Sequence, residues 1–407
     1  MNCRHCSTTL QHVFLDLGFA PPSNAYLTKD QLQQPELYLP LKLFVCHECW
    51  LVQTVDYATA KDLFRYDYAY YSSTSTSWME HAARYASSMI DSLGLGPNSF
   101  VLEVASNDGY LLRNFLPFGI PCLGIEPTEG TANAAENLGI PVLREFFGNA
   151  LGKRLAIEGK QADLIIGNNV YAHVPNINDF TDGLKSVLKV GGVITLEFPH
   201  LMRLISQAQF DTVYHEHFSY LSLQCVSHIF AKAGLRVWDV QELSTHGGSL
   251  RVYGCHADDG RDNSGAVARV LGDEISHGVR DLATYLKFQP RADRVKDDLL
   301  AFLLDQKRIG KKVAAYGAAA KGNTLLNYAG VKPDLIPFVC DAAAAKQGKF
   351  MPGSHIPILP PAVLLEKRPD YLVILPWNIA PEIKQQNIRL AELGTKFVTA
   401  VPKLEII

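Results

Sequence analysis

The stretch SFVLEVASNDGYLL, residues 99–112, decides the fold that we predict for this chain. It opens with a short apolar run, typical of a buried strand, and continues into a polar turn that ends at Gly109, where a helix is expected to begin. A tight turn at the carboxyl edge of a parallel sheet lets the backbone approach a ligand closely. We therefore expect a nucleotide or nucleoside site at this turn.

Strand and helix patterns alternate after this turn. Four more short apolar runs follow, separated by helix-like segments, so the five units predict a parallel sheet covered on both faces. Two strand-like runs, 235–243 and 249–256, are then joined by Ser-Thr-His-Gly-Gly into a hairpin. A hairpin at the end of such a sheet is the order of a class I (Rossmann-like) methyltransferase domain rather than of a dehydrogenase. The four runs are PCLGIEP (121–127), PVLREFF (141–147), ADLIIGNNV (162–170) and VITLEFP (193–199).

The turn after the first strand lacks the dinucleotide fingerprint GxGxxG, because Ala105 and Asn107 stand where two glycines would be expected. The second strand ends in Glu126, whose carboxylate is suited to accept hydrogen bonds from ribose hydroxyls. An acid there without pyrophosphate-binding glycines favours S-adenosylmethionine over NAD. The alternative is that Glu126 caps the helix beginning at Thr128. The candidate cofactor-binding residues are Glu103, Ser106, Asn107, Asp108, Gly109, Glu126, Asn168 and Asn169.

Two CxxC pairs lie near the N-terminus, Cys3 with Cys6 and Cys46 with Cys49. Two such pairs supply four thiolates for a tetrahedral zinc ion. Because sulfur would fill all four positions, no site remains for a catalytic water, so the predicted zinc is structural. The alternative is a set of ordinary reduced cysteines.

Two segments rich in tyrosine and histidine are candidates for the reaction centre. Tyrosines crowd residues 66–71, either at a domain seam or around a pocket, and a helix is expected from Trp78 to Leu93. After the fifth strand comes the segment YHEHFSY, 214–220, whose histidines are two apart and so do not match the zinc protease pattern HExxH. Histidine suits a base near neutral pH, and His173 after the fourth strand is a candidate substrate contact. The alternative is a polar loop with incidental histidines.

The last part of the chain predicts a second, smaller α/β domain. The stretch YGAAAKGNT, 316–324, places small residues and Lys321 at a turn into a helix, which suits a phosphate but lacks the P-loop pattern. We divide the chain into a zinc-binding domain (1–70), a methyltransferase domain (71–258) and a C-terminal Rossmann-like α/β domain (259–407).

The composition excludes other classes. The 407 residues are enough for two or three domains, and 38 basic against 41 acidic residues give a net charge of -3, which argues against a nucleic-acid binder. No apolar run reaches the roughly 18 residues of a membrane helix, and the N-terminus has no signal-peptide pattern. We therefore expect a cytoplasmic protein without a membrane partner.

These motifs together resemble the bacterial sugar C-methyltransferases that act on nucleotide-linked 4-keto-hexoses, in particular the NDP-hexose 3-C-methyltransferases of the mycarose type. The resemblance covers the whole chain, including ExxSNDG, NNVxAHV, YHEHFSY, HGGSLR, AAKGNT and KQG. The sequence departs from the family at Ala105, where glycine is usual, and at Pro376, which precedes Trp377 and Asn378.

The resemblance implies a mechanism and a set of residues. His217 would be the general base that forms an enolate at sugar carbon 3, supported by Glu216, Tyr214 and His173, with Tyr68 in the pocket unless Tyr70 or Tyr71 is the true match. The last domain would hold the nucleotide diphosphate, and the enzyme would be a monomer or weak homodimer. The substrate-binding candidates are Tyr71, Ser249, Arg251, Lys321, Asn323 and Lys346.

Three other functions remain open at this point. An O- or N-methyltransferase on a sugar nucleotide or other small metabolite would use the same scaffold. A zinc-containing nucleic-acid methyltransferase or binding protein is disfavoured by the net charge. An NAD-dependent sugar reductase built on the last domain is disfavoured because Lys321 stands in place of a ribose-binding acid.

Overall fold

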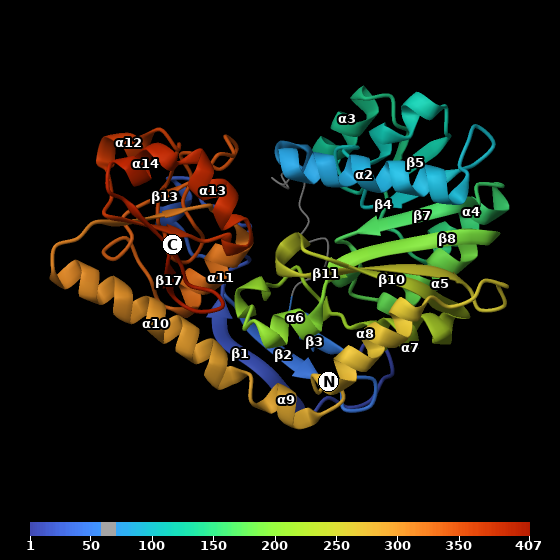
Figure 1. The fold of residues 1–407 in the computed structure, drawn as a ribbon, viewed down its shortest axis with the longest axis horizontal. Helices are drawn as coiled ribbons and strands as arrows, with labels where there is room; N and C mark the ends of the chain where they lie inside the picture. The colour runs from blue at the N-terminus through green and yellow to red at the C-terminus, as the bar shows by residue number, and fades with distance from the viewer. Residues whose placement is uncertain (58–70) are drawn as a thin grey trace.

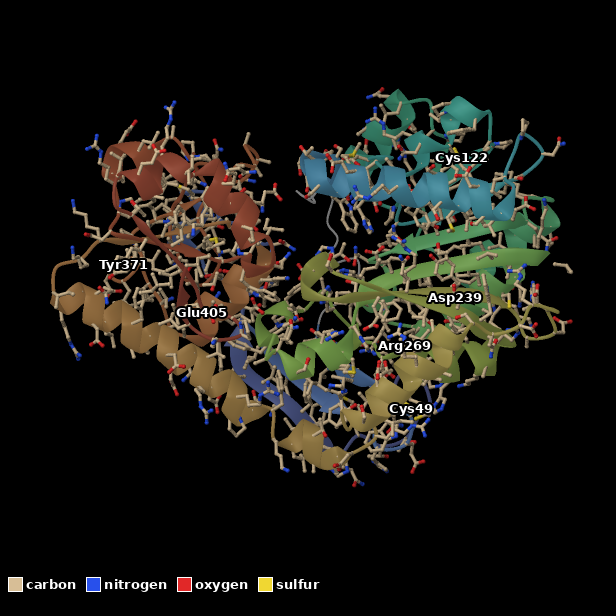
Figure 2. All side chains as sticks on the ribbon, viewed as in Figure 1. Cys49, Cys122, Asp239, Arg269, Tyr371 and Glu405 are labelled. Carbon is tan, nitrogen blue, oxygen red and sulfur yellow. The ribbon has the colours of Figure 1, made fainter. Side chains whose placement is uncertain are left out.

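The computed structural model describes residues 1–57 and 71–407, and its chain forms two lobes joined at their base (Figure 1). The methyltransferase lobe carries the green and cyan strands, and the C-terminal lobe carries the red and orange elements. Blue strands of the N-terminal segment lie at the base, and helix α10 (Gln289–Arg308) runs from there along the lower edge of the C-terminal lobe. Cys122 and Tyr371 mark the two lobes in Figure 2.

The central sheet confirms the predicted class I methyltransferase order. Its strands run in the order β10-β11-β8-β7-β4-β5-β6, and β11 is antiparallel to both of its neighbours while the other pairs are parallel. Parallel strands align their carboxyl ends at one edge, so the turns after β4, β5, β7 and β8 meet there. The strands are β4 (Val101–Val104), β5 (Cys122–Ile125), β6 (Val142–Leu143), β7 (Ala162–Asn168), β8 (Leu188–Pro199), β10 (Leu235–Leu243) and β11 (Ser249–His256).

Helices cover this sheet, and their ends follow local capping rules. The predicted helix at 78–93 begins two residues earlier, because the Ser75 side chain accepts a hydrogen bond from the Trp78 backbone, and it stops at Gly94, whose φ of 59° is left-handed. The helices of this lobe are α2 (Thr76–Leu93), α3 (Glu129–Asn137), α4 (Asn149–Ile157), α5 (Ile177–Val187), α6 (Leu201–Ser206), α7 (Leu223–Ala233) and α8 (Gly265–Ser276). Among the described residues, no helix is long and apolar enough to cross a membrane.

The N-terminal sheet borrows a strand from the methyltransferase lobe. Its order is β1-β2-β3-β9, all antiparallel, and Ser219 and Tyr220 of β9 pair with Gln53 and Val52 of β3. Strand β9 directly follows the segment that carries His217, so the N-terminal sheet anchors one end of that segment. The strands are β1 (His12–Ala20), β2 (Leu39–Val45), β3 (Val52–Thr54) and β9 (Ser219–Tyr220).

The C-terminal lobe is the second α/β unit that the sequence predicts. Its sheet has the order β14-β13-β12-β15-β16-β17, parallel except for the last pair. The strands are β12 (Val313–Tyr316), β13 (Val339–Cys340), β14 (Ile358–Leu359), β15 (Tyr371–Ile374), β16 (Lys396–Thr399) and β17 (Glu405–Ile406). The helices are α9 (Leu282–Leu286), α10 (Gln289–Arg308), α11 (Ala320–Tyr328), α12 (Val363–Lys367), α13 (Ala380–Gln386) and α14 (Ile388–Glu392).

The packing of α8 bears on the domain division. Its buried Val267 and Val270 belong to the core of the methyltransferase sheet, and its buried Glu274 accepts a backbone hydrogen bond from Leu223 at the start of α7 and contacts His200 at 2.7 Å. Helix α8 therefore packs with the methyltransferase lobe, although the division proposed at 258/259 assigns it to the last domain. The proposed end of the zinc-binding domain, residue 70, lies outside the described residues.

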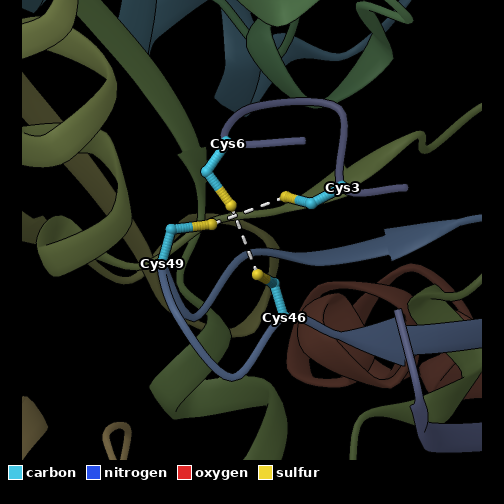
Figure 3. A group of neighbouring side chains, drawn as sticks. All are labelled: Cys3, Cys6, Cys46 and Cys49. Carbon is cyan, nitrogen blue, oxygen red and sulfur yellow. Dashed lines mark hydrogen bonds between the residues drawn. The ribbon is translucent and has the colours of Figure 1, made fainter. Parts of the chain in front are cut away.

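The four cysteines of the two CxxC pairs meet at one point beside the methyltransferase lobe (Figure 3). Their sulfur atoms all lie within 4.8 Å of one another, with 3.5 Å between Cys3 and Cys49 and 3.5 Å between Cys6 and Cys46. Sulfurs about 2.3 Å from a tetrahedral zinc ion are about 3.8 Å apart, so this cluster fits zinc. Cys46 and Cys49 bracket the turn from β2 into β3, so a bound zinc fixes the strand that pairs with β9.

Replacement of one ligand tests the zinc site. We expect the purified wild-type chain to hold about one zinc ion and Cys46→Ser to lose it, because three thiolates bind far more weakly than four. Thermal unfolding of the variant should begin at a lower temperature. Metal analysis by mass spectrometry and a melting curve measure both effects. Cys255→Ser, a buried cysteine on β11, is the matched control and should keep its zinc. Equal zinc in both variants would contradict the assignment.

Candidate active site

The turn after β4 has the left-handed backbone conformation of a glycine-rich loop, although Ala105 stands where the family usually has glycine. Ala105 and Asn107 have φ values of 56° and 50°, in the left-handed region, and Gly109 has 76°. The departure at Ala105 therefore leaves the left-handed conformation in place. The Asn107 and Asp108 side chains accept backbone hydrogen bonds, at 2.9 and 3.1 Å, from the residues just before α2.

Buried polar atoms without partners mark this turn as a ligand site. Within residues 1–57 and 71–407, no hydrogen-bond partner is found for Oε2 of Glu103, Oγ of Ser106, Oδ1 of Asp108 or either side-chain polar atom of Asn168. Burial, together with the carboxylates of Asp108 and Glu126, raises the pKa of Glu103 well above its ordinary value. Since buried polar groups are almost always hydrogen-bonded, a polar ligand such as S-adenosylmethionine fits this site.

The Glu126 carboxylate accepts hydrogen bonds from the turn after β4 and from the turn after β5. One carboxylate oxygen, Oε1, accepts the backbone N–H of Thr128 at 2.9 Å, so Glu126 caps α3, which was the alternative to a ribose contact. The other, Oε2, accepts the backbone N–H of Asn107 at 3.0 Å. A carboxylate oxygen accepts two hydrogen bonds, so Oε2 keeps one position for a ribose hydroxyl. Capping and ribose binding are therefore compatible, and the ribose contact stays a prediction.

Three predicted residues meet in an aromatic cluster at the carboxyl edge of the sheet. The ring of His217 lies 4.6 Å from that of His173 and 4.0 Å from that of Tyr214, centre to centre. Nδ1 of His217 is 3.1 Å from the Thr212 carbonyl oxygen. Because a carbonyl only accepts, Nδ1 carries the hydrogen and Nε2 carries the lone pair in the neutral ring. Burial, His173, His246 and Lys321 lower the pKa of His217 well below its ordinary value.

Glu216 is buried beside this cluster and contacts the N-terminal domain. Its Oε1 accepts a hydrogen bond from the Asn24 amide at 3.1 Å, and burial raises its pKa to about 7. The side chain of His173 is half-buried, and its loss of solvation lowers its pKa to about 4. The predicted pocket residues Tyr68 and Tyr70 lie outside the described residues. Tyr71 lies over the start of α3, where its hydroxyl would meet a side chain at Gly130.

Lys321 reaches this region from the C-terminal lobe. It is on the first turn of α11, and its ammonium group donates to the His246 carbonyl at 3.3 Å and to Oδ1 of Asn378 at 2.9 Å. Burial lowers its pKa to about 8, against an opposing effect of Asp211. Nε2 of His246 lies 3.3 Å from the side-chain nitrogen of Asn169, which belongs to the predicted cofactor site.

Three of the other substrate-binding candidates already have polar partners within the protein. Arg251 forms a buried ion pair with Glu197 at 2.7 Å, and the Ser249 hydroxyl donates to the Thr245 carbonyl at 3.0 Å. Lys346 donates to the Ala318 carbonyl at 2.8 Å, just before α11. Asn323 is buried within α11. Their contacts with substrate stay predictions.

Several residues of this region are not among the site residues that the sequence predicts. Glu197 at the end of β8 also contacts His81 of α2 at 3.0 Å. Burial opposes its charge, yet the hydrogen bond with His81 and the charge of Arg251 outweigh that effect and lower its pKa. His246, Asp211 and the pair Trp377 and Asn378 were likewise missed as site residues. The HGG (246–248) and PWN (376–378) segments stand out in the sequence, but nothing in it indicates that they are in contact.

Comparison with known proteins agrees with this geometry. Three family models match: a zinc binding domain over residues 3–64, a methyltransferase domain over 78–240 and a C-methyltransferase C-terminal domain over 244–402. C-methyltransferase NovU of Streptomyces niveus is 33% identical over 405 residues, 100% of this chain and 96% of NovU. An uncharacterized methyltransferase of Mycobacterium leprae (strain TN) is 29% identical over 98 residues, 24% of this chain and 36% of that protein.

Among solved structures, the SAM-bound magnesium protoporphyrin IX methyltransferase of Synechocystis PCC 6803 matches with a TM-score of 0.33 and 14% identity, over 43% of this chain and 78% of that one. The strand order and the family models define the class: this is an S-adenosylmethionine-dependent methyltransferase with a zinc-binding domain. The chain belongs to the C-methyltransferase family that includes NovU. The recognised family, the fold class and the two cofactors are thereby confirmed.

The left-handed alanine in the cofactor turn gives a stability prediction. The left-handed conformation costs an L-residue roughly 1–2 kcal/mol, and glycine loses about 0.5–1 kcal/mol through backbone entropy. Ala105→Gly should therefore raise the free energy of unfolding by about 0.5 kcal/mol. Urea denaturation followed by circular dichroism measures it. Ala132→Gly, within helix α3, is the control and should lower the same quantity by about 1 kcal/mol. Equal losses in both variants would contradict the strain at Ala105.

Proposed function

We propose that this C-methyltransferase methylates carbon 3 of a nucleotide-linked 4-keto-deoxyhexose through an enolate, with Nε2 of His217 as the base. The observation that carries the proposal is the buried, neutral imidazole whose Nδ1 is held by the Thr212 carbonyl. It is supported by membership of the C-methyltransferase family and by the sequence motifs shared with sugar C-methyltransferases. The proposed compartment is the cytoplasm.

Methylation at carbon requires a base that removes a carbon-bound proton, whereas an O- or N-methyltransferase need not act on a ketone. A ketone at carbon 4 acidifies the proton on carbon 3, and removal of this proton gives an enolate. When bound, S-adenosylmethionine supplies an electrophilic methyl group. Nε2 of His217 receives the carbon-bound proton and later releases it to solvent. Phenol, imidazole or lysine donors around the carbonyl oxygen stabilise the charge that develops there, an effect of several kcal/mol per donor.

The surroundings of His217 suit this role. His173 and Tyr214 lie on the ring at 4.6 and 4.0 Å between centres, so the imidazole is held in one orientation. Its lone pair is available at neutral pH because burial disfavours the imidazolium form. The nucleotide diphosphate is proposed to lie near the start of α11, a nine-residue helix whose amino end presents backbone N–H groups.

Deuterium exchange tests the enolate step. The wild-type enzyme, incubated in deuterated water without S-adenosylmethionine, should incorporate deuterium at carbon 3 of a nucleotide-linked 4-keto-6-deoxyhexose, as read by NMR. His217→Gln should slow this exchange and methyl transfer by about 10²–10⁴, the contribution of a general base, while S-adenosylmethionine binding is kept. His277→Gln, an exposed histidine, is the matched control.

An O- or N-methyltransferase gives a different result in the same assay. Its product would carry the new methyl group on a heteroatom, and no deuterium would enter carbon 3. Mass spectrometry and NMR of products from a panel of thymidine-, cytidine- and guanosine-diphosphate 4-keto-hexoses separate the two. A heteroatom product, or full exchange in His217→Gln, would overturn the proposal.

The depressed pKa of His217 predicts the acid side of the pH profile. An ordinary histidine would lose its base form as pH falls through about 6.5. Because the pKa of His217 is lowered, the ring stays neutral there, so its contribution to kcat/KM should persist below pH 6.5. The initial rate of carbon 3 exchange between pH 5 and 7, in buffers of constant ionic strength, measures this. A single-proton loss of rate centred at 6.5 or above and assigned to His217 would contradict it.

A further inference from the structure

A group of buried and half-buried charged and aromatic side chains joins the two lobes beside the reaction centre. Lys321 and Trp377 come from the C-terminal lobe, and Asp211 comes from the short turn after α6 in the methyltransferase lobe. The Lys321 ammonium lies 4.7 Å from the centre of the Trp377 ring. The indole N–H of Trp377 donates to Oδ2 of Asp211 at 2.7 Å. Trp377 therefore stands between a half-buried cation and a buried carboxylate.

The position of Trp377 is fixed from several sides. A Cβ at Gly247 would come within 2.3 Å of the Trp377 ring, so only glycine lets the hairpin after β10 approach so closely. Pro376, the second departure from the family pattern, packs on Gly317, where a Cβ would lie 2.4 Å from its ring. Thr324 of α11 donates to the Val213 carbonyl at 2.7 Å, which ties the helix of Lys321 to the turn of Asp211. The geometry thus depends on both lobes.

Among the residues that the structure describes, Lys321 has one more N–H donor than it has acceptors. An ammonium group has three N–H donors, and within residues 1–57 and 71–407 two acceptors are found, the His246 carbonyl and Asn378. The charged and titratable groups that face it are Asp211, His217 and His246. Its charge lowers the pKa of both histidines, so it acts on the electrostatics around the base.

The burial of a carboxylate next to a half-buried ammonium group needs an explanation. Asp211 is fully buried, and Oδ1 has no hydrogen-bond partner among the described residues. Burial raises the pKa of Asp211 to about 6, against opposing effects of Lys321 and the Trp377 hydrogen bond, so it is mostly charged at neutral pH. A carboxylate and an ammonium group close to each other and away from bulk water each favour the charged form of the other. Asp211 thus serves as the counter-ion of Lys321.

We propose that Lys321 is a catalytic residue, the donor that stabilises the enolate oxygen, and that Asp211 and Trp377 are positioning residues that keep it charged and in place. This inference rests on the proposed enolate mechanism. As His217 takes the proton from carbon 3, the C–H electron pair forms the bond to carbon 4 and the carbonyl pair moves onto oxygen. Lys321 donates a hydrogen bond to that oxygen and keeps its proton. When carbon 3 takes the methyl group from the sulfonium of S-adenosylmethionine, the methyl–sulfur bond breaks with its electron pair on sulfur, S-adenosylhomocysteine is left, and the carbonyl re-forms.

The carbon 3 exchange assay tests the role of Lys321. Lys321→Met should slow exchange at least about 100-fold, as the loss of an oxyanion donor does, whereas Lys321→Arg should keep more of the rate because it keeps the charge. The wild-type rate should fall above about pH 8, where Lys321 loses its proton, and this fall should be absent in Lys321→Arg because arginine stays protonated.

The pH profile also tests the positioning residues. Asp211→Asn removes the counter-ion, so the fall in rate should move to lower pH by about one unit or more. Trp377→Phe keeps the ring face but loses the hydrogen bond to Asp211, so it should change the profile in the same direction by less. Trp238→Phe, on β10 and away from this group, is the matched control and should leave the profile unchanged. A purely structural role would lower the rate equally at all pH values.

The outcomes separate this inference from the proposed function. If the wild-type enzyme exchanges carbon 3 and Lys321→Met does so equally fast, the lysine role is overturned while the enolate mechanism stands. If the wild-type enzyme shows no exchange with substrates that it methylates, the enolate mechanism itself fails. Melting curves and S-adenosylmethionine binding show that each variant is folded. An unshifted profile in folded Asp211→Asn overturns the positioning role.

Discussion

The short pairing of β3 with β9 is the constraint on which the rest of the site depends. Strand β9 begins at Ser219, two residues after His217, so the register of this pair sets where the histidine segment ends. Strand β3 follows Cys49 closely, and the four-cysteine cluster fixes its start. A metal that takes no part in the reaction thus determines, through one strand pair, the position of the proposed base.

The two lobes share a core instead of meeting at a simple interface. Phe14 of β1 stacks on Phe288 at 4.7 Å and meets Tyr285 edge-on at 5.5 Å, and the same cluster of buried residues continues to Val313 of β12. Buried apolar contact of this kind is the main source of stability in protein folding. The N-terminal sheet therefore packs against both lobes. This packing keeps α11 close to the segment 214–220 that carries His217.

The predictable features were those with a local pattern. The CxxC spacing, the strand and turn at Glu103 and the terminal hairpin follow from short stretches, and the structure confirms the order that they predict. The group around Asp211, His246 and Trp377 was not predictable, because its members are 35 to 166 residues apart and no local pattern indicates that they meet. Helix α8 shows the same limit, since an amphipathic pattern does not say which sheet the apolar face covers.

The segment that follows β1 determines which residues must be exchanged together in a chimera of this enzyme. Leu27 forms a backbone bridge with Phe350, and Glu36 accepts the Gly353 backbone N–H at 2.7 Å and contacts His355 at 2.8 Å. This part of the N-terminal domain is therefore structurally a piece of the C-terminal lobe. A chimera that exchanges the C-terminal lobe with that of a relative must carry residues 21–38 with it, so the modular boundary is discontinuous along the chain.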